Sequence, residues 1–389
     1  MRTQVAIIGG GPSGLLLGQL LHKSGIETVI LERQSRAHVL GRIRAGVLEA
    51  GLVNLMDEAG VGARLSRESF LHHGTNIAYP GGMFHLDFKA LIDQHVTVYG
   101  QTELTQDLYD ARDASGLPTL HECSDVTLCD IETKTPCVEF VHNDQTKRLT
   151  CDIIAGCDGF HGPSRQAIPL KKRREFEKTY PFGWMGVLSE TPPVNDELIY
   201  ANSTRGFALC SMRNPTLSRY YVQCDLSDSP DNWSDNRFWD ELKRRIPQEA
   251  ADALITGPSI EKSIAPLRSF VCEPMQWGRL FLCGDAAHIV PPTGAKGLNT
   301  AASDVYYLWQ ALLAFYHDKD EAALERYSET ALARVWKTQR FSWYMTKLLH
   351  HFPDQSEFDR NIQHAELAHL AENRAAQMAL AQNYVGLPY

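Results

Sequence analysis

The chain has 389 residues, 43% of them hydrophobic and 22% charged, which is typical of a globular protein with room for two or three domains. Its formal net charge of −9 argues against a nucleic-acid-binding surface, and no apolar run approaches the roughly 18 residues of a membrane span. The nine cysteines form no CxxC pair and the histidine pairs at 72–73 and 350–351 accompany no HExxH motif, so we expect reduced thiols, a cytoplasmic protein and no metal site.

The N-terminal segment carries a nucleotide-binding pattern. The apolar run 5–8 predicts a buried parallel strand that follows too closely on the first residue to be a signal peptide. Gly9 and Gly11 permit a tight turn and the close approach of a pyrophosphate, and Gly14 lets the next helix pack on the strand. That helix begins near Ser13 and directs its N-terminal amide groups at the phosphates.

A second strand, predicted over 27–32, ends in Glu32, 18 residues after Gly14. This spacing suits a carboxylate on a ribose hydroxyl, so the context favours a dinucleotide over a merely structural glycine turn. Residues 97–101 and a helix around 104–111 are predicted to return to the same domain. Another apolar strand over 152–156 leads to Asp158-Gly159, a dipeptide that is common in turns.

Residues 180–265 predict a β-rich insertion, with hairpin turns at 202–206 and 214–215. Side chains alternate along a strand, so Ser211 and Arg213 share a face, and Tyr221 could return to it from the next strand. A guanidinium flanked by two hydroxyls can bind a carboxylate, whereas an isolated hairpin arginine is more often a solvated residue.

Residues 279–299 predict a second cofactor segment far downstream. An apolar strand over 280–283 breaks at Gly284-Asp285, crosses a proline- and glycine-rich loop and reaches a helix near Leu298-Asn299. A carboxylate at a strand end, followed by a helix N-terminus, suits a large polar cofactor, so both signals should converge on one ligand. From residue 300 onward the apolar spacing is helical.

The glycine pattern 9–14, Asp158-Gly159 and Gly284-Asp285, in this order, resemble the three fingerprints of the class A flavoprotein aromatic monooxygenases. Residues 40–49, 206–213 and 264–270 extend the resemblance to substrate motifs, and it covers the chain from Arg2 to Tyr389. The resemblance implies an α/β fold with a Rossmann-like FAD-binding domain, an inserted β-sheet substrate domain and a C-terminal helical region. The implied segments are an FAD-binding domain over 1–179 with an excursion towards the substrate domain at about 73–95, a substrate domain over 180–266, the completion of the FAD-binding domain over 267–320, and a helical region over 321–389.

The resemblance is closest to the members that hydroxylate 4-hydroxybenzoate at C3 in aromatic degradation, yielding 3,4-dihydroxybenzoate (protocatechuate). It implies FAD, O2 and NADPH as reactants, with NADH possible, a flavin C4a-hydroperoxide as the hydroxylating species, and a homodimer. The implied FAD contacts are Gly9, Gly11, Ser13, Gly14, Glu32, Arg42, Ile43, Arg44, Ala45, Gly46, Val47, Gln101, Asp158, Asp285, Leu298 and Asn299. Among these, Leu298 and Asn299 are expected at the flavin ring edge, where Lys296 could add positive charge.

By the same resemblance, Tyr200, Ser211, Met212, Arg213, Tyr221 and Pro292 bind the substrate. Tyr200 and Tyr384 match the family's tyrosine pair, with His72 as the solvent end of a proton relay. A role for Tyr384 requires the C-terminal segment to dock against the active site. The implied NADPH contacts are Arg33, Gln34, His38, His161 and Arg268.

Several alternatives stay open. Arg33, Arg36 and His38 favour the 2′-phosphate of NADPH, but strongly NADPH-preferring members usually carry tyrosine where His38 stands. The substrate could instead be 3,4-dihydroxybenzoate or another para-hydroxylated benzoate. Competing classes on the same scaffold are a flavin-dependent halogenase or dehydrogenase, and a catalytically silent flavin-binding protein; the Trp-x-Trp-x-x-Pro motif of halogenases is absent from the sequence.

Overall fold

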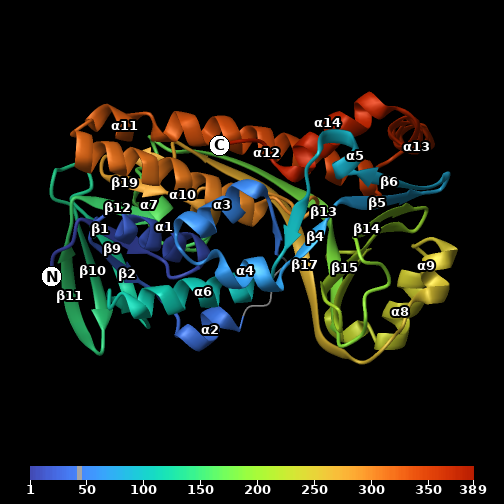
Figure 1. Ribbon diagram of the computed structural model, residues 1–389, viewed down its shortest axis with the longest axis horizontal. Helices are drawn as coiled ribbons and strands as arrows, with labels where there is room; N and C mark the ends of the chain where they lie inside the picture. The colour runs from blue at the N-terminus through green and yellow to red at the C-terminus, as the bar shows by residue number, and fades with distance from the viewer. Residues whose placement is uncertain (42–45) are drawn as a thin grey trace.

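The computed structural model describes residues 1–41 and 46–389. Figure 1 shows two bodies side by side, one built around a six-stranded sheet and the other around an eight-stranded sheet. The long helix α12 (Tyr327–Leu349) runs along both bodies, and the long strands β13 (Arg174–Ser189) and β17 (Ser259–Glu273) extend from one towards the other. No helix in the described ranges is long and apolar enough to cross a membrane.

The six-stranded sheet has the order β18-β19-β12-β1-β2-β8. Its central strand β1 (Val5–Ile8) pairs in parallel with β2 (Thr28–Leu31) and β12 (Ile153–Gly156), and β12 pairs in parallel with β19 (Leu280–Leu282). These strands are fully buried, as expected for a parallel sheet covered on both faces, and their prediction is confirmed. The edge strands are β8 (Thr119–Leu120) and the antiparallel β18 (Gln276–Trp277).

Helices α1 (Pro12–Lys23), α6 (Gln101–Ala114) and α10 (Gly297–Leu313) pack together over this sheet, and α3 (Ala50–Glu58) packs on α10. The antiparallel strands β9 (Ser124–Cys129), β10 (Cys137–His142) and β11 (Gln145–Thr150) add side chains to the same core. The predicted helix after residue 101 therefore returns to this body. The strand before it, β7 (Val96–Val98), instead lies in a small antiparallel sheet with β3 (Val47–Leu48) and β4 (Phe70–His72).

The eight-stranded sheet has the order β20-β17-β13-β16-β15-β14-β5-β6. Its remaining strands are β5 (Gly74–Tyr79), β6 (Gly82–Asp87), β14 (Ile199–Ser203), β15 (Gly206–Asn214), β16 (Leu217–Cys224) and β20 (His288–Ile289). The two predicted hairpins are present as β14–β15 and β15–β16. Two helices that the sequence did not predict, α8 (Asp235–Lys243) and α9 (Gln248–Ala253), bury their apolar faces against one side of this sheet.

The opposite face of the eight-stranded sheet is covered by the C-terminal helices α12, α13 (Glu357–Glu372) and α14 (Arg374–Val385). Helix α14 also packs on α5 (Phe88–Ile92). The shorter helices are α2 (Arg36–Leu40), α4 (Gly62–Glu68), α7 (Ser164–Ala167) and α11 (Glu321–Glu325), with 3₁₀ helices at Pro230–Asn232 and Gly284–Ala286 and a π-helical turn at Ala314–Asp318. The C-terminal helices thus close the face of the sheet on which the predicted substrate residues lie.

Candidate cofactor and substrate site

The two cofactor segments of the sequence meet at the carboxyl edge of the six-stranded sheet. They line one cleft of about 740 Å³, which also receives the ends of β2 and β12. Because β1, β12 and β19 are adjacent parallel strands, the loops that follow them lie side by side at this edge. The predicted residues that line the cleft are Gly9, Gly11, Ser13, Glu32, Arg33, Gln34, His38, Gln101, Asp158, His161, Asp285 and Leu298.

The turn between β1 and α1 leaves room for a ligand on one side only. Gly9 has φ +106°, and a Cβ there would lie 2.3 Å from the carbonyl oxygen of Cys157. Gly14 packs so closely beneath this turn that a Cβ would lie 2.0 Å from the Gly9 carbonyl oxygen. A Cβ on Gly11 would meet nothing within 4 Å, and Gly11 is also the N-cap of α1. The first-turn amide groups of α1 therefore face the cleft without a capping side chain, which is the arrangement that binds a phosphate.

Glu32 shapes this turn. Its Oε2 accepts a hydrogen bond from the Gly10 amide at 2.6 Å, and its Oε1 accepts one from the Gln34 amide at 2.7 Å. The Tyr109 hydroxyl donates to the Gly10 carbonyl at 2.9 Å from the other side. A carboxylate oxygen has more than one lone pair, so Glu32 can hold the turn and still accept from a ribose hydroxyl.

Asp158 and Asp285 enter the cleft from neighbouring strand ends. Asp158 Oδ2 accepts from the Ser164 amide at 2.9 Å, whereas its Oδ1 is buried and has no hydrogen-bond partner among the described residues. Burial raises the pKa of Asp158, and the bonds from Ser164 oppose this shift. Asp285 lies exposed at the mouth, on the turn Gly284–Ala286.

Helix α10 presents a second N-terminus to the same cleft through Gly297 and Leu298. The Asn299 side chain is already bonded to protein: Oδ1 accepts from the Glu49 amide at 2.9 Å, and Nδ2 donates to the Val47 carbonyl at 2.8 Å. Contact with a flavin edge would therefore come from the amide groups of the first turn of α10. Gly46 lies beside Tyr99, and the Tyr99 amide donates a hydrogen bond to the Gly46 carbonyl at 2.9 Å. The predicted contacts over 42–45 lie outside the described residues.

Lys296 differs from its expected role. Its Nζ is buried and donates to Glu49 Oε1 and to the Tyr384 carbonyl, both at 2.6 Å. Burial lowers the pKa of Lys296, and Glu49 opposes this shift. The adjacent carboxylate compensates the charge of this lysine locally, so the cationic character of the flavin-edge region comes from the N-terminus of α10 rather than from a free lysine.

The cleft as a whole fits an FAD-type dinucleotide. Two helix N-termini separated by a long, partly enclosed groove can receive a pyrophosphate at α1 and an electron-accepting ring at α10. The open space at Gly11 and the unpartnered Asp158 oxygen are features that a bound ligand would fill and satisfy.

Strand register brings the predicted substrate residues onto one face of the eight-stranded sheet. Tyr200 on β14 pairs with Leu209 on β15, which pairs with Tyr221 on β16. Ser211 follows Leu209 by two positions and shares its face. Arg213 sits at an irregularity between Met212 and Asn214, which turns its side chain towards Ser211.

The Arg213 guanidinium contacts hydroxyl groups rather than a carboxylate. Its Nη1 donates to Ser211 Oγ at 3.2 Å, and it lies within hydrogen-bonding range of Tyr221. Its Nε is buried without a partner, and no carboxylate within residues 1–41 and 46–389 forms an ion pair with it. The nearby Glu261 pairs instead with Arg219 at 2.9 Å. Burial lowers the pKa of Arg213, so an anionic ligand would relieve an uncompensated buried charge.

The Tyr200 and Tyr384 hydroxyls are 3.0 Å apart and buried. Burial raises the pKa of Tyr200 to about 12, against the hydrogen bonds from Tyr384 and the Gly294 backbone. Burial likewise raises the pKa of Tyr384, against a hydrogen bond with Thr75. Both tyrosines therefore stay protonated near neutral pH and can pass a proton from one hydroxyl to the other.

His72 does not reach solvent in this structure, in contrast to its expected place at the outer end of a relay. The side chain is 2% exposed, and both ring nitrogens lack partners among the described residues. Burial lowers the pKa of His72, and the charges of Glu197 and Asp196 oppose this shift. The solvent boundary lies further out, where Glu197 contacts the half-exposed imidazole of His85 at 2.6 Å. Strand β4 is short and packs against β7, which places the imidazole inside rather than at the edge.

Met212 and Pro292 flank this region with their backbones. The Met212 side chain is buried, and its carbonyl accepts from Ser211 Oγ at 3.4 Å. Pro292 is exposed in the loop before α10, and its carbonyl accepts from the Ala295 amide at 2.9 Å.

Comparison with known proteins agrees with this geometry. A family model described as "FAD binding domain" matches residues 2–342. The chain is 56% identical over 390 residues to the p-hydroxybenzoate hydroxylase of Acinetobacter baylyi, covering all of this chain and 96% of that protein. The chain belongs to the class A flavoprotein monooxygenase family.

Weaker matches are found to one further relative in sequence and to solved structures in fold. A 3-(3-hydroxy-phenyl)propionate/3-hydroxycinnamic acid hydroxylase of Burkholderia cenocepacia is 25% identical over 78% of this chain and 56% of its own length. The crystal structure of a p-nitrophenol 4-monooxygenase from Pseudomonas putida superposes with a TM-score of 0.84 over the full length of both chains, at 17% identity. A flavin-dependent halogenase, CmlS, superposes with a TM-score of 0.74 at 19% identity over 97% of this chain and 72% of its own, so the fold alone does not distinguish a hydroxylase from a halogenase.

Four of the five residues that the resemblance assigned to nicotinamide binding line the cleft, and Arg268 does not. Arg33 is exposed there beside Gln34, His38 and His161. Arg36 is already occupied: it forms ion pairs with Asp110 and Asp113 and lies 4.7 Å from the ring centre of Tyr109. Arg268 is half-buried outside the cleft lining, with its guanidinium 4.8 Å from the ring centre of Phe160.

Sequence reasoning missed the residues that hold the C-terminal segment. Arg334 on α12 donates to Glu49 Oε2 at 3.1 Å and to the carbonyls of Leu387 and Pro388 at 2.5 and 3.0 Å. Together with the bond from Lys296 to the Tyr384 carbonyl, these contacts dock the segment that carries Tyr384. No local pattern signals this cluster, because Glu49, Lys296 and Arg334 are far apart in sequence and each resembles an ordinary surface charge.

Proposed function

We propose that this monooxygenase hydroxylates 4-hydroxybenzoate at C3, using FAD, NADPH and O2, to yield 3,4-dihydroxybenzoate. The observation that carries the proposal is the pairing of the half-buried Arg213, which forms no ion pair with a carboxylate among the described residues, with a buried tyrosine pair on the same face of one sheet. A para-hydroxybenzoate has the matching chemistry, a carboxylate at one end and a phenol at the other. The relative from Acinetobacter baylyi, which is named for this substrate, supports the choice.

In this proposal the carboxylate binds the Arg213 guanidinium, flanked by the hydroxyls of Ser211 and Tyr221. At the other end, Tyr200 donates a hydrogen bond to the phenolic oxygen. A hydrogen bond to the charged form lowers a pKa, so Tyr200 favours the phenolate, whose ring is richer in electrons. The phenol proton leaves through the two hydroxyls: Tyr200 takes it up as it gives its own proton to Tyr384, 3.0 Å away, and Tyr384 in turn releases one proton to a further acceptor such as water. When bound, FAD supplies the reduction of O2 and the transfer of one oxygen atom to the ring.

The FAD would lie in the cleft between α1 and α10, with its pyrophosphate at the amide groups after Gly11 and its ribose near Glu32. Asp285 would face the ribityl chain and the first turn of α10 the flavin ring. The buried sheet face excludes water from the aromatic substrate, because α12 and α14 cover it.

We further propose NADPH as the preferred reductant, bound at the mouth of the cleft near Arg33, and the four-segment domain division given by the resemblance. A cytoplasmic location is consistent with nine free cysteine thiols, eight of them buried. The homodimer remains a prediction, which sedimentation of the purified protein would measure.

The test is an oxidation assay with NADPH and NADH over a panel of hydroxybenzoates, with hydroxylated product and H2O2 both quantified. We expect 4-hydroxybenzoate to stimulate NADPH oxidation and to yield 3,4-dihydroxybenzoate with little peroxide. Faster coupled turnover of 3,4-dihydroxybenzoate would reassign the substrate. Oxidation that no aromatic acid stimulates would point to a flavin-binding protein without hydroxylase activity.

A further inference from the structure

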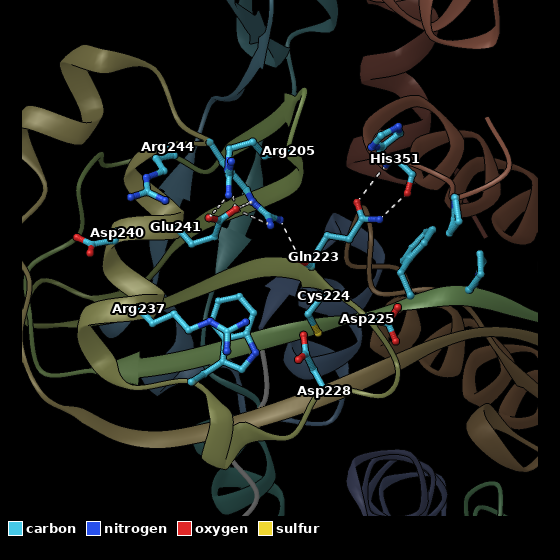
Figure 2. A pocket seen from close by; sticks show the side chains of 15 residues that line it. Arg205, Gln223, Cys224, Asp225, Asp228, Arg237, Asp240, Glu241, Arg244 and His351 are labelled. Carbon is cyan, nitrogen blue, oxygen red and sulfur yellow. Dashed lines mark hydrogen bonds and ion pairs between the residues drawn. The ribbon is translucent and has the colours of Figure 1, made fainter. Parts of the chain in front are cut away.

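Three consecutive residues at the end of α12 each bond to a different strand of the eight-stranded sheet. We call Leu349–His351 the 349–351 segment. The Leu349 carbonyl accepts from Asn202 on β14 at 3.2 Å, and His350 Nε2 accepts from the Trp184 indole on β13 at 2.7 Å. The His351 backbone exchanges two hydrogen bonds with the side-chain amide of Gln223 on β16: Nε2 donates to the His351 carbonyl at 2.5 Å, and the His351 N–H donates to Oε1 at 3.1 Å (Figure 2). The segment therefore ties three strands of the substrate face together.

The polar cleft drawn in Figure 2 lies beside this segment and encloses about 790 Å³; three of its lining charges, Arg205, Glu241 and Arg245, are paired with one another. The Glu241 carboxylate accepts hydrogen bonds from Arg205 at 2.7 Å and from Arg245 at 2.8 Å. Arg245 also donates to the carbonyls of Phe207 and Gln223. These bonds connect Glu241 of α8 to β15 and β16 through Arg245. Within the 349–351 segment, His350 contributes a buried imidazole.

The position of His350 defines its tautomer. Its Nδ1 lies 2.9 Å from the Thr346 carbonyl, which can only accept, so Nδ1 carries the proton. Nε2 is then a pure acceptor for the Trp184 indole, which can only donate. The ring is fully buried and stacks on Phe182 and Phe207, with ring centres 4.8 and 4.3 Å away. Burial lowers the pKa of His350 to about 3, so the acceptor persists at any working pH.

Trp184 connects this acceptor to the carboxylate end of the substrate site. Its ring centre lies 5.1 Å from that of Tyr221 and 4.8 Å from that of Phe207. Tyr221 is the hydroxyl neighbour of Arg213. On β14, Asn202 follows Tyr200 by two positions and therefore points to the same face, so the 349–351 segment also holds the strand of the phenol end.

We propose that His350 is a positioning residue for substrate binding, in which Nε2 holds the Trp184 indole and thereby sets the place of Tyr221 beside Arg213. This inference rests on the proposed function, since it assumes that the Arg213 site receives the substrate carboxylate. The competing explanation is that His350 only fills space between aromatic rings. A phenylalanine would satisfy that role, and it would leave the buried Trp184 N–H without an acceptor.

The test compares His350→Phe, His350→Gln and His364→Phe as FAD-loaded enzymes. The first keeps a ring but removes the acceptor, and the second keeps an acceptor oxygen. The third makes the same exchange at a half-exposed histidine of α13. The dissociation constant for 4-hydroxybenzoate is measured by calorimetry, together with KM for both substrates. We expect His350→Phe to weaken 4-hydroxybenzoate binding roughly tenfold, with KM for NADPH unchanged. His350→Gln should recover most of the loss, and His364→Phe should match the parent.

A double-mutant cycle with Trp184→Phe separates the hydrogen bond from general packing. Once the indole donor is gone, His350→Phe should weaken binding no further. Additive effects, or unchanged binding in a His350→Phe protein that retains FAD, would overturn the proposal. The calorimetric readout needs no turnover. A parent enzyme that binds 4-hydroxybenzoate but does not hydroxylate it would therefore refute the proposed function while the binding shift still decides the role of His350. A parent that does not bind it refutes both.

Discussion

Replacing Arg334 with methionine should release the segment that carries Tyr384. Arg334 is buried, pairs with Glu49 at 3.1 Å, donates to the carbonyls of Leu387 and Pro388, and lies 4.7 Å from the ring centre of Tyr389. Breaking a buried ion pair costs about 3–5 kcal/mol. Hydrogen bonds from a charged donor add about 1.5–3 kcal/mol each, although such contributions overlap.

Lys296 remains as a partner for Glu49 in the Arg334→Met enzyme, and methionine refills part of the volume. We therefore take the lower end, about 3 kcal/mol, as the loss in docking free energy, which corresponds to roughly a hundredfold shift towards the undocked segment. Undocking should remove the Tyr384 hydroxyl from the substrate site but leave FAD bound, because neither Tyr384 nor Arg334 lines the cofactor cleft. NADPH oxidation should continue while the product formed per NADPH falls and H2O2 rises.

The assay measures product and peroxide per NADPH consumed, together with limited proteolysis of the C-terminal segment. The matched control is Arg326→Met, which removes an exposed ion pair with Asp320 just before α12 and should cost less than about 1 kcal/mol. If Arg334→Met keeps the parent's coupling and the parent's resistance to protease, then Arg334 does not hold the segment and the reasoning fails.

Three other perturbations follow from the site. Arg213→Ala should raise KM for 4-hydroxybenzoate on the order of a hundredfold with FAD still bound, because a charge-assisted carboxylate contact is lost, and an unchanged KM would remove Arg213 from the clamp. Tyr200→Phe should slow hydroxylation roughly tenfold and divert oxygen to H2O2, since one buried hydroxyl contact to the substrate oxygen disappears; full coupling in this variant would exclude Tyr200 from the relay. Arg33→Ala should raise KM for NADPH severalfold while Arg36→Ala leaves it unchanged, because Arg36 is already paired with Asp113; equal effects in steady-state assays would contradict this distinction.

The fold is similar to that of a flavin-dependent halogenase and of a p-nitrophenol 4-monooxygenase, two proteins named for different reactions. All three share the overall fold, so the fold by itself does not identify the reaction. Arg213 and Tyr200 lie on one face of the eight-stranded sheet, and they are separated in sequence only by a hairpin. The substrate proposed for this protein therefore follows from the side chains on the face of the eight-stranded sheet and not from the cofactor cleft.

The sequence alone determined the cofactor elements, because each is a local signal. A glycine turn, an apolar strand and a helix start within a few residues, so their periodicity and turn chemistry are readable without a partner. Alternation along 207–213 likewise predicted that Ser211 and Arg213 share a face. The helices α8 and α9 were not predicted, although α8 carries a local signal in its Ser234 N-cap and its apolar face; both helices are short and lie inside a segment that otherwise has strand-like alternation.

Only the tertiary structure decided which charges are free and which are satisfied. Lys296 and Arg36 look equally available in sequence, yet one is bonded to Glu49 and the other to Asp113. His72 was expected at the solvent end, but strand pairing with β7 buries it. Ion pairing and burial depend on residues brought together from distant parts of the chain, so no local pattern reports them. The docking of Tyr384 beside Tyr200 is the clearest case, since its supports are the N-cap residues of α3 and α10 and Arg334 of α12, whose contacts exist only in the folded chain.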